Sequence, residues 1–274
     1  MWNKPIRYIL VTLTACLFFV SCGKNDPSVN ASRLRVKLTD AGSFTIKELL
    51  IDIRAIDVLP VDTAGKEGEW VSLDYSGGTY DLLKLMNGRT VQLIDQYFPA
   101  GGKIGKLKLL FGNNSHIWTN TEKEFKLNIP QELLDGVVID HVDAVLTPNI
   151  ITTVVIDVNA ALSVREENGN YYLRPEVRAF DETFGGSMRG YVTPVDAGPI
   201  VGIANDPDTF FTLPEGERGM FMFTGLKAGE WTISVFARPE SGYQDTTFTD
   251  SIFLRKRTEL KPIVLKLKPA PPSE

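Results

Sequence analysis

Charged and apolar side chains alternate strictly in the stretch that decides the fold, Arg33-Leu34-Arg35-Val36-Lys37-Leu38. Successive side chains of an extended chain point to opposite faces, so the apolar residues share one face and the basic residues the other. This period of two predicts a half-buried β-strand. The pattern returns over residues 49–53 and resumes in the opposite phase over residues 56–58, which predicts a β-bulge near Arg54-Ala55.

Further segments have the same β-rich character, at residues 107–111, 125–129, 142–146, 153–158 and 171–173. Residues 81–88 predict one clear helical turn, because Asp81 can cap its start and Gly88 suits a left-handed exit. Strands without regular intervening helices favour an antiparallel sandwich over a parallel strand–helix–strand sheet. We therefore expect an all-β fold of two consecutive antiparallel β-sandwich domains with one or two short helices.

The strand pattern is interrupted near residues 184–187, and a second run of strands begins at Met188. We place the N-terminal sandwich at residues 33–184 and the second sandwich at residues 185–268. The Pro-rich residues 269–274 are expected to be a flexible tail.

The first 22 residues are typical of a secretion signal. Lys4 and Arg7 precede an apolar stretch at residues 8–20 that is shorter than the roughly 20 residues a membrane-spanning helix needs. This stretch ends in Phe19-Val20-Ser21-Cys22, which resembles the bacterial lipobox and implies cleavage between Ser21 and Cys22 with acylation of Cys22. An ordinary signal peptide that happens to contain a cysteine is the competing interpretation.

Residues 1–21 are thus expected to be a lipoprotein signal peptide and residues 22–32 a polar tether. The expected partner is a lipid membrane, held through the acylated Cys22. The expected location is the cell envelope, as an outer-membrane lipoprotein. Weak similarity of residues 24–26 to a surface-export signal favours display at the cell surface, while a periplasmic orientation stays open.

Composition argues against several classes of function. A formal net charge of −5 disfavours a nucleic-acid partner, and only two cysteines and two histidines leave little for metal sites. Phosphate-loop, dinucleotide and Gly-x-Ser-x-Gly fingerprints are missing from the sequence. We interpret residues 140–143 as a solvated strand or turn and residues 166–170 as a hairpin turn. No catalytic residue, metal ligand or cofactor is predicted.

Exposed aromatic rings are the candidate ligand contacts, because flat rings stack on sugars or anchor a protein partner. The candidates are Trp118, Trp70 and Tyr80, and packing in the core is the competing interpretation for each. Trp231, by contrast, alternates with Ile233 and Val235 and is predicted to lie in the core.

Three short motifs resemble the O-glycosylation acceptor of some Gram-negative bacteria. They are Asp62-Thr63-Ala64, Asp245-Thr246-Thr247 and Asp250-Ser251-Ile252, with Thr63, Thr246 and Ser251 as the acceptors.

Four motifs occur in the order seen in an uncharacterised bacterial lipoprotein family, domain of unknown function 4382. They are residues 38–41, residues 81–88, residues 98–101 followed by 106–109, and residues 172–178. The resemblance covers roughly residues 32–180. It implies a β-sandwich and an envelope location, without an assigned activity.

Residues 219–235 combine alternating aromatics, a Gly-Leu-x-x-Gly turn and a Trp-x-Ile-x-Val strand. This order resembles the carboxypeptidase regulatory-like or transthyretin-like β-sandwich over residues 186–268. The resemblance implies a non-catalytic spacer or binding module, although fold alone does not decide function.

The predicted function is a membrane-anchored envelope lipoprotein that acts as a non-enzymatic binding, adhesion or structural module. A glycan or another envelope protein is the expected ligand. Two alternatives stay open: an envelope hydrolase with an acid-only carboxylate site between the domains, and a metal or small-molecule carrier.

Overall fold

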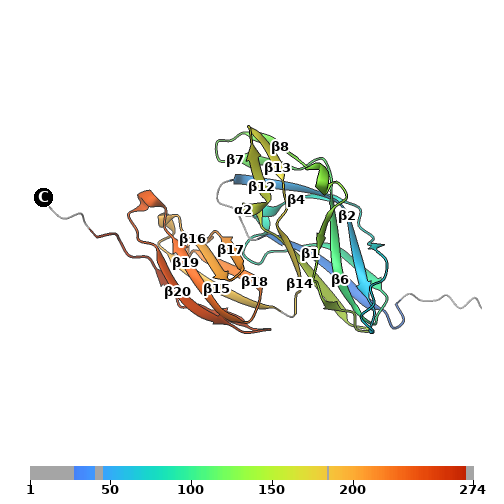
Figure 1. Cartoon of the computed structure of the whole chain (residues 1–274). Helices are drawn as coiled ribbons and strands as arrows, with labels where there is room; N and C mark the ends of the chain where they lie inside the picture. The colour runs from blue at the N-terminus through green and yellow to red at the C-terminus, as the bar shows by residue number, and fades with distance from the viewer. Residues whose placement is uncertain (1–27, 41–45, 184, 270–274) are drawn as a thin grey trace, which may run out of the picture.

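The computed structural model describes residues 28–40, 46–183 and 185–269 (Figure 1). The predicted signal peptide, including Ser21, and the predicted acylation site Cys22 lie outside these residues. Within the described ranges, no helix is both long enough and apolar enough to cross a bilayer. The predicted all-β class is confirmed, because strands dominate the described chain.

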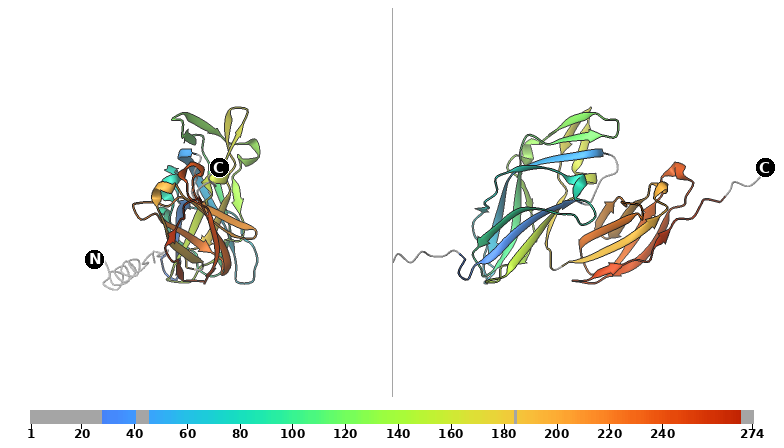
Figure 2. Two further views of the ribbon diagram at one scale, coloured as in Figure 1. Left: turned by 90° about the vertical axis from the view of Figure 1, so that its left-hand side faces the viewer. Right: turned by 180° about the vertical axis from the view of Figure 1, so that it is seen from behind.

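Two separate clusters of buried side chains form the cores. One contains residues between Leu34 and Leu173, and the other contains residues between Met188 and Leu265. Figures 1 and 2 show the two sandwiches next to each other, with the start of the described chain (blue) and its end (red) at opposite ends of the molecule. The described chain therefore enters the first sandwich far from the point where it leaves the second.

Two sheets enclose the first core. The smaller has the strand order β14-β11-β1-β5, with bounds Val177–Asp181, Ile151–Val158, Ser32–Asp40 and Val91–Phe98. In β1, the side chains of Leu34, Val36 and Leu38 are fully buried, as their alternation predicts.

The larger sheet has ten strands and the main order β10-β6-β2-β7-β8-β13-β12. Their bounds are Ala144–Val145, Lys103–Phe111, Ile46–Val61, His116–Thr119, Glu124–Asn128, Asn170–Leu173 and Val164–Glu167. β3 (Val71–Ser72) and β4 (Gly78–Asp81) also pair with β2, and β9 (Val137–Ile139) pairs with β6.

Strand β2 is the longest element and bends where the sequence predicts. The register of β2 against β6 shifts between Ile53 and Ala55, which confirms the bulge. A second shift lies between Leu59 and Pro60, beyond the predicted one.

Two four-stranded sheets enclose the second core. One has the order β18-β15-β21, with β22 also paired to β15, and the other has the order β17-β16-β19-β20. The bounds, from β15 to β22, are Gly186–Thr193, Ile200–Asn205, Asp208–Thr212, Met220–Leu226, Gly229–Phe236, Thr246–Ile252, Arg257–Glu259 and Ile263–Val264. Trp231 is fully buried, as predicted, and its Nε1 donates to the Lys227 carbonyl oxygen at 3.0 Å.

Antiparallel pairs dominate the sheets, as expected, and three of the four sheets also contain parallel pairs. β1 pairs with β11 in parallel, as do β13 with β8 and β15 with both β21 and β22. Alternation reports which face of a sheet a side chain takes, but it carries no information about the direction of the neighbouring strand.

The predicted helical turn is a 3₁₀ helix, η2 (Leu82–Leu85). Asp81 makes no side-chain capping bond there, so the predicted cap is wrong, and Asp81 instead forms an ion pair with Lys84 at 3.0 Å. Gly88 has a φ of 78°, which confirms the left-handed exit. The described chain otherwise has the α-helix α2 (Ala160–Ser163) and the 3₁₀ helices η3 (Gln131–Leu133), η4 (Val195–Ala197) and η5 (Pro239–Ser241).

Candidate functional site

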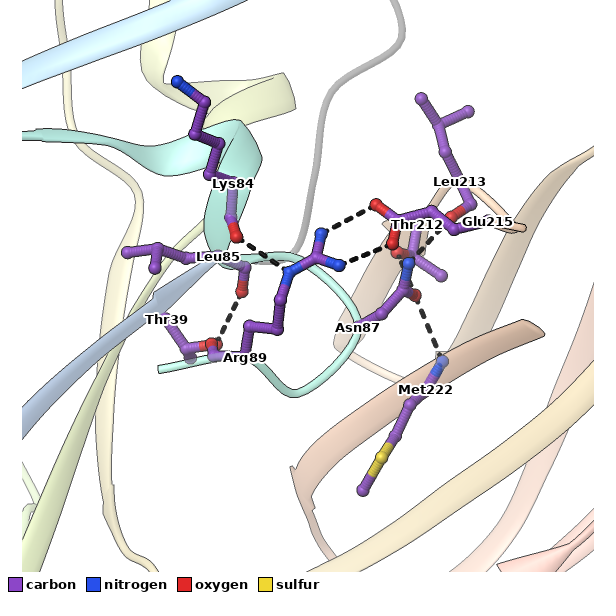
Figure 3. A network of polar contacts seen from close by, with 9 residues as sticks. All are labelled: Thr39, Lys84, Leu85, Asn87, Arg89, Thr212, Leu213, Glu215 and Met222. Atoms are coloured by element: carbon purple, nitrogen blue, oxygen red, sulfur yellow. Dashed lines mark hydrogen bonds and ion pairs between the residues drawn. The ribbon is translucent and has the colours of Figure 1, made fainter. Parts of the chain in front are cut away.

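The interface between the two sandwiches carries the densest polar network that joins distant parts of the chain. Asn87, in the loop after η2, has a φ of 59°, a conformation that asparagine adopts more readily than most residues. Its Nδ2 donates to the Leu213 carbonyl oxygen at 3.0 Å, and its Oδ1 accepts from Thr212 Oγ1 at 3.0 Å and from the Met222 amide at 3.2 Å (Figure 3). Asn87 is 6% exposed, so the first sandwich inserts a buried side-chain amide that makes three hydrogen bonds to the second.

Arg89, beside Asn87, forms a bidentate ion pair with Glu215. Its Nη1 and Nη2 donate to the two carboxylate oxygens of Glu215 at 2.6 and 2.7 Å, and its Nε donates to the Lys84 carbonyl oxygen at 2.8 Å (Figure 3). The hydrogen bonds from Arg89 hold the pKa of Glu215 below its usual value, although partial burial acts in the opposite direction. Thr39 Oγ1 donates to the Leu85 and Arg89 carbonyl oxygens, which fixes the loop that presents both residues.

Arg178 of β14 forms a second junction. Its Nε and Nη2 donate to Asp157 Oδ2 at 2.9 and 2.6 Å, Nη1 donates to the Gly225 carbonyl oxygen at 2.7 Å, and Nη2 also donates to the Thr224 carbonyl oxygen at 2.8 Å. The guanidinium lies 4.0 Å from the centroid of the Phe210 ring. Arginine suits this position because its planar guanidinium group can donate several hydrogen bonds and stack on an aromatic ring at the same time.

Close backbone contact completes the interface. Gly225 has a φ of 63°, and a Cβ built on it would lie 2.4 Å from carbons of the Phe180 ring. The second sandwich therefore approaches the first so closely that only a glycine fits against this ring.

Several cavities border the interface, among them one of about 210 Å³ and one of about 560 Å³. The smaller of these two is lined by Asp157, Asn159 and Glu176 from the first sandwich and by Asp208 and Phe210 from the second. The larger is more apolar, and its lining includes Phe180, Leu226 and Leu254.

The smaller cavity bears on the alternative of an acid-only site between the domains. Of its three carboxylates, Asp157 pairs with Arg178, and Asp208 pairs with Lys227 at 2.8 Å. Glu176 has no ion-pair partner in the part of the chain that the structure describes. Sequence reasoning anticipated a place for carboxylates between the domains but named none of these three residues.

The alternative of a metal carrier requires a cluster of metal-ligating side chains. No group of three or more His, Cys, Asp or Glu side chains among the described residues is arranged to hold a metal ion. Two aspartates of β2 bond to other groups: Asp52 Oδ2 accepts from the backbone N–H of Asn114 at 3.0 Å, and Asp57 Oδ1 accepts from Ser72 Oγ at 2.7 Å.

The three candidate aromatic residues lie apart along β2. Trp118 is the cross-strand partner of Glu48, whereas Trp70 directly precedes Val71, the partner of Val58. Ten residues of strand separate these two positions, a distance of roughly 30 Å at about 3.3 Å per residue. The structure therefore does not bring the two tryptophan rings together, and Tyr80 is the cross-strand partner of Ile51, between the two positions.

Their environments also differ. Trp70 is 39% exposed, with Lys108 Nζ 4.9 Å from its ring centroid, whereas Trp118 is half-buried. Tyr80 packs against the first core, and its hydroxyl lies 3.0 Å from that of Tyr75. Burial and this hydrogen bond raise the pKa of Tyr75. Trp70 is consequently the most accessible candidate of the three.

The candidate glycosylation acceptors lie on the surface or at a sheet edge. Thr63 is exposed in the turn after β2, where Asp62 Oδ1 accepts hydrogen bonds from the Ala64 and Lys66 amides. Thr246 and Ser251 are half-buried on β20, the outer strand of its sheet. Their modification stays a prediction.

Of the two segments interpreted from the sequence, residues 166–170 contain a hairpin turn and residues 140–143 form a loop. Asn168 and Gly169 join β12 to β13 with φ values of 53° and 77°, which confirms the hairpin turn. Residues 140–143 form a loop in which Val142 is buried while His141 and Asp143 are exposed. His141 and Asp143 have φ values of 58° and 51°, so the alternating strand considered for them is not formed.

No curated protein has a significantly similar sequence. Among solved structures, the Bacillus anthracis TIE protein is 14% identical, with 87% of this chain and 34% of that chain covered and a TM-score of 0.22. The minor pilin GBS52 of Streptococcus agalactiae is 10% identical, with 88% and 98% covered and a TM-score of 0.25. The shaft pilin SpaA of Lactobacillus rhamnosus GG is 12% identical, with 88% and 100% covered and a TM-score of 0.26.

The chain spans about a third of the length of the TIE protein. At these identities and scores, the similarities do not indicate an activity.

The family comparison is more specific. The model described as "Domain of unknown function (DUF4382)" matches residues 31–175, which is more than half of the chain and covers nearly all of the first core. This match confirms the family resemblance of the sequence motifs. The chain therefore belongs to the DUF4382 family.

Proposed function

We propose that this protein is an envelope lipoprotein whose two sandwiches act as one stiff, non-enzymatic module that holds a binding surface away from the membrane. The observation that carries this proposal is the interface, in which Asn87, Arg89 and Arg178 bond the first sandwich to the second. Domains in one chain move relative to each other by default unless their interface is large and well packed. Here several buried hydrogen bonds and a close glycine contact oppose such motion.

The proposed anchor lies near one end of this module. Cys22 precedes Ser28, the first described residue, by only six positions, and six extended residues span at most about 22 Å. Acylation of Cys22 would keep the first sandwich close to the bilayer. The second sandwich, which resembles a spacer or binding module, would then project away from it, because the blue start and the red end of the described chain lie at opposite ends (Figure 2).

A glycan or another envelope protein is the proposed ligand. Trp70 offers a ring for stacking, while the charge of Lys108 beside it is balanced by Asp57 at 3.0 Å, so the ring itself is the proposed contact. The outer membrane, with the module facing outward, is the proposed location.

Acyl labelling of two cysteine variants tests the anchor. Cells expressing the wild-type chain, Cys22→Ser or the matched control Cys16→Ser are fed an alkyne-tagged palmitate, and the membrane fraction is analysed for label. We expect label and membrane retention in the wild type and in Cys16→Ser, and neither in Cys22→Ser. Equal labelling of Cys22→Ser would overturn the proposal.

A further inference from the structure

The last strands of the second sandwich carry a concentrated positive charge. Residues 253–268, which we call the basic edge, hold six basic residues and one acidic residue, a net charge of +5 in a chain whose total is −5. Residues 185–252, the rest of the same sandwich, hold four basic and nine acidic residues. Opposite charges are thus separated within one domain, so this surface attracts anions although the whole protein is acidic.

The basic edge is an outer strand region of its sheet. β21 and β22 pair in parallel with β15, and no other strand in the described ranges pairs with them. The register carries the edge from Arg257 to Val264 along six residues of β15, a length of about 20 Å at about 3.3 Å per residue. Figure 1 shows this red segment leading to the C-terminal end of the second sandwich. The positive charge is therefore spread along a line.

The acidic residue of the edge does not cancel this charge. Arg257 and Glu259 pair in register with Ser187 and Arg189, so all four side chains share the outer face of the sheet. Arg189 and Arg257 lie 2.9 and 2.8 Å from the same carboxylate oxygen of Glu259. Two guanidinium groups on one carboxylate leave a positive charge at this point.

Four further basic side chains are available to an anion. Arg255, Lys256, Lys261 and Lys266 are all exposed, and no carboxylate pairs with them in the part of the chain that the structure describes. Lys268 differs from these four, because its Nζ donates to the Pro239 carbonyl oxygen at 2.9 Å. The sandwich itself therefore makes no use of these four charges.

Exposed apolar side chains lie among the charges. Phe253, Leu254, Val264 and Leu267 are 57%, 43%, 68% and 65% exposed. Exposed apolar side chains gathered on one surface indicate an interaction site. The partner must then offer both anionic groups and apolar contact. A sugar ring that bears an acidic group offers both, since its C–H bonds form an apolar face.

The type of basic residue also bears on the partner. Four of the six are lysines, a residue that is depleted in protein–protein interfaces. A lysine ammonium is a point charge on a flexible stem, so it can follow anions at variable positions. A polymer of repeated anions matches a charged line about 20 Å long better than a single small anion does. The anchoring bilayer is a poorer match, because the second sandwich is proposed to project away from it.

We propose that the basic edge binds a linear acidic glycan, with Arg255, Lys256, Lys261 and Lys266 as the contacts for its anionic groups. This inference goes beyond the contact proposed at Trp70, because it assigns a separate surface and a charge class to the ligand. The choice of a glycan over the anchoring bilayer rests on the orientation proposed above, and binding itself does not depend on acylation.

Surface plasmon resonance on the purified chain carrying Cys22→Ser tests the proposal. The immobilised probes are polygalacturonate, dextran sulfate, neutral dextran, and phosphatidylcholine vesicles with one quarter phosphatidylglycerol. We expect binding to an acidic glycan and none to dextran. Binding should be lost at about 1 M salt, where the screening length falls to about 3 Å. Binding of only one acidic glycan would identify carboxylate or sulfate as the preferred group.

Variants of equal charge locate the surface. Lys261→Gln combined with Lys266→Gln is expected to weaken binding to the acidic glycan at least fivefold. The matched control combines Lys66→Gln with Lys126→Gln, two exposed lysines of the first sandwich, and is expected to bind as the unsubstituted chain does. Circular dichroism verifies that each variant is folded, and the edge pair Arg255→Gln with Lys256→Gln keeps the test valid if the first pair unfolds.

Four results would overturn the proposal. They are no binding to either acidic glycan, equal binding to dextran, binding to the anionic vesicles without binding to the acidic glycans, and equal losses in the edge and control variants. Each of them leaves the acylation experiment on Cys22 unaffected, so failure of this inference is distinguishable from failure of the proposed anchor.

Discussion

Substitution of Asn87 by alanine is expected to uncouple the two sandwiches. The change removes three hydrogen bonds and leaves the Leu213 carbonyl oxygen, the Thr212 hydroxyl and the Met222 amide without this partner. At about 1 kcal/mol each, the three bonds contribute about 3 kcal/mol. Alanine must also adopt the left-handed φ of 59°, which adds about 1 kcal/mol. The expected loss is therefore about 4 kcal/mol, most of it from the interface.

Asn149→Ala is the matched control for the backbone contribution. Asn149 has a φ of 60° and is exposed in a loop of the first sandwich, and no hydrogen bond of its side chain is found in the described chain. Its replacement should cost only about 1 kcal/mol. The difference between the two variants isolates the hydrogen bonds of Asn87.

Urea denaturation followed by tryptophan fluorescence measures the effect. Trp231 reports on the second sandwich, and Trp70 and Trp118 report on the first. We expect one coincident transition for the wild type, two separate transitions for Asn87→Ala, and a larger radius of gyration of this variant in X-ray solution scattering. Equal losses for Asn87→Ala and Asn149→Ala, with unchanged scattering, would refute the reasoning that the interface makes the module stiff.

Two further predictions concern the same interface. Gly225→Ala should lower the free energy of unfolding by about 2 kcal/mol or more, because the new methyl group would contact the Phe180 ring and the backbone has a left-handed φ. Gly216→Ala is the control, because Gly216 also has a positive φ but lies in open space. Thermal denaturation of both variants should show a smaller loss of stability for Gly216→Ala. Arg89 lowers the pKa of Glu215 in the folded state. The ion pair therefore stabilises the fold fully at a pH above the unfolded glutamate pKa of about 4.3, and this contribution is lost as the pH falls through the lower pKa of the folded state. Glu215→Gln should flatten that part of the stability profile, and an unchanged profile would contradict the assignment.

Local patterns predict the elements of this fold well, because the alternation of side chains depends on the chain itself. The phase change across Arg54 and Ala55 corresponds to the observed register shift, and Asn168-Gly169 forms the predicted hairpin turn. Trp231 lies in the core because its apolar neighbours two and four residues later share its face. In each case, the signal lies within a few residues.

Strand direction and sheet order depend on contacts that no local pattern encodes. The parallel pairing of β1 with β11 joins Arg33 to Ile151, across more than a hundred residues. The missing cap at Asp81 has a different character: its Oδ2 pairs with Lys84, and its Oδ1 is buried without a hydrogen-bond partner among the described residues, although the residue type suits a cap.

At the interface, the residues that form a local turn also contact a distant part of the chain. Asn87 and Gly88 have the composition of a helix exit, and both do have positive φ values. Yet Asn87 bonds to residues about 125 positions away, and a Cβ on Gly88 would lie 3.1 Å from Met222 Sδ of the second sandwich. The turn alone would accept other pairs of residues that tolerate a positive φ, whereas the interface uses the amide at the first position and leaves little room for a side chain at the second. A residue pair that satisfies a turn and an interface at once gives no sequence signal for the interface, so only the three-dimensional structure reveals that the second sandwich is attached here.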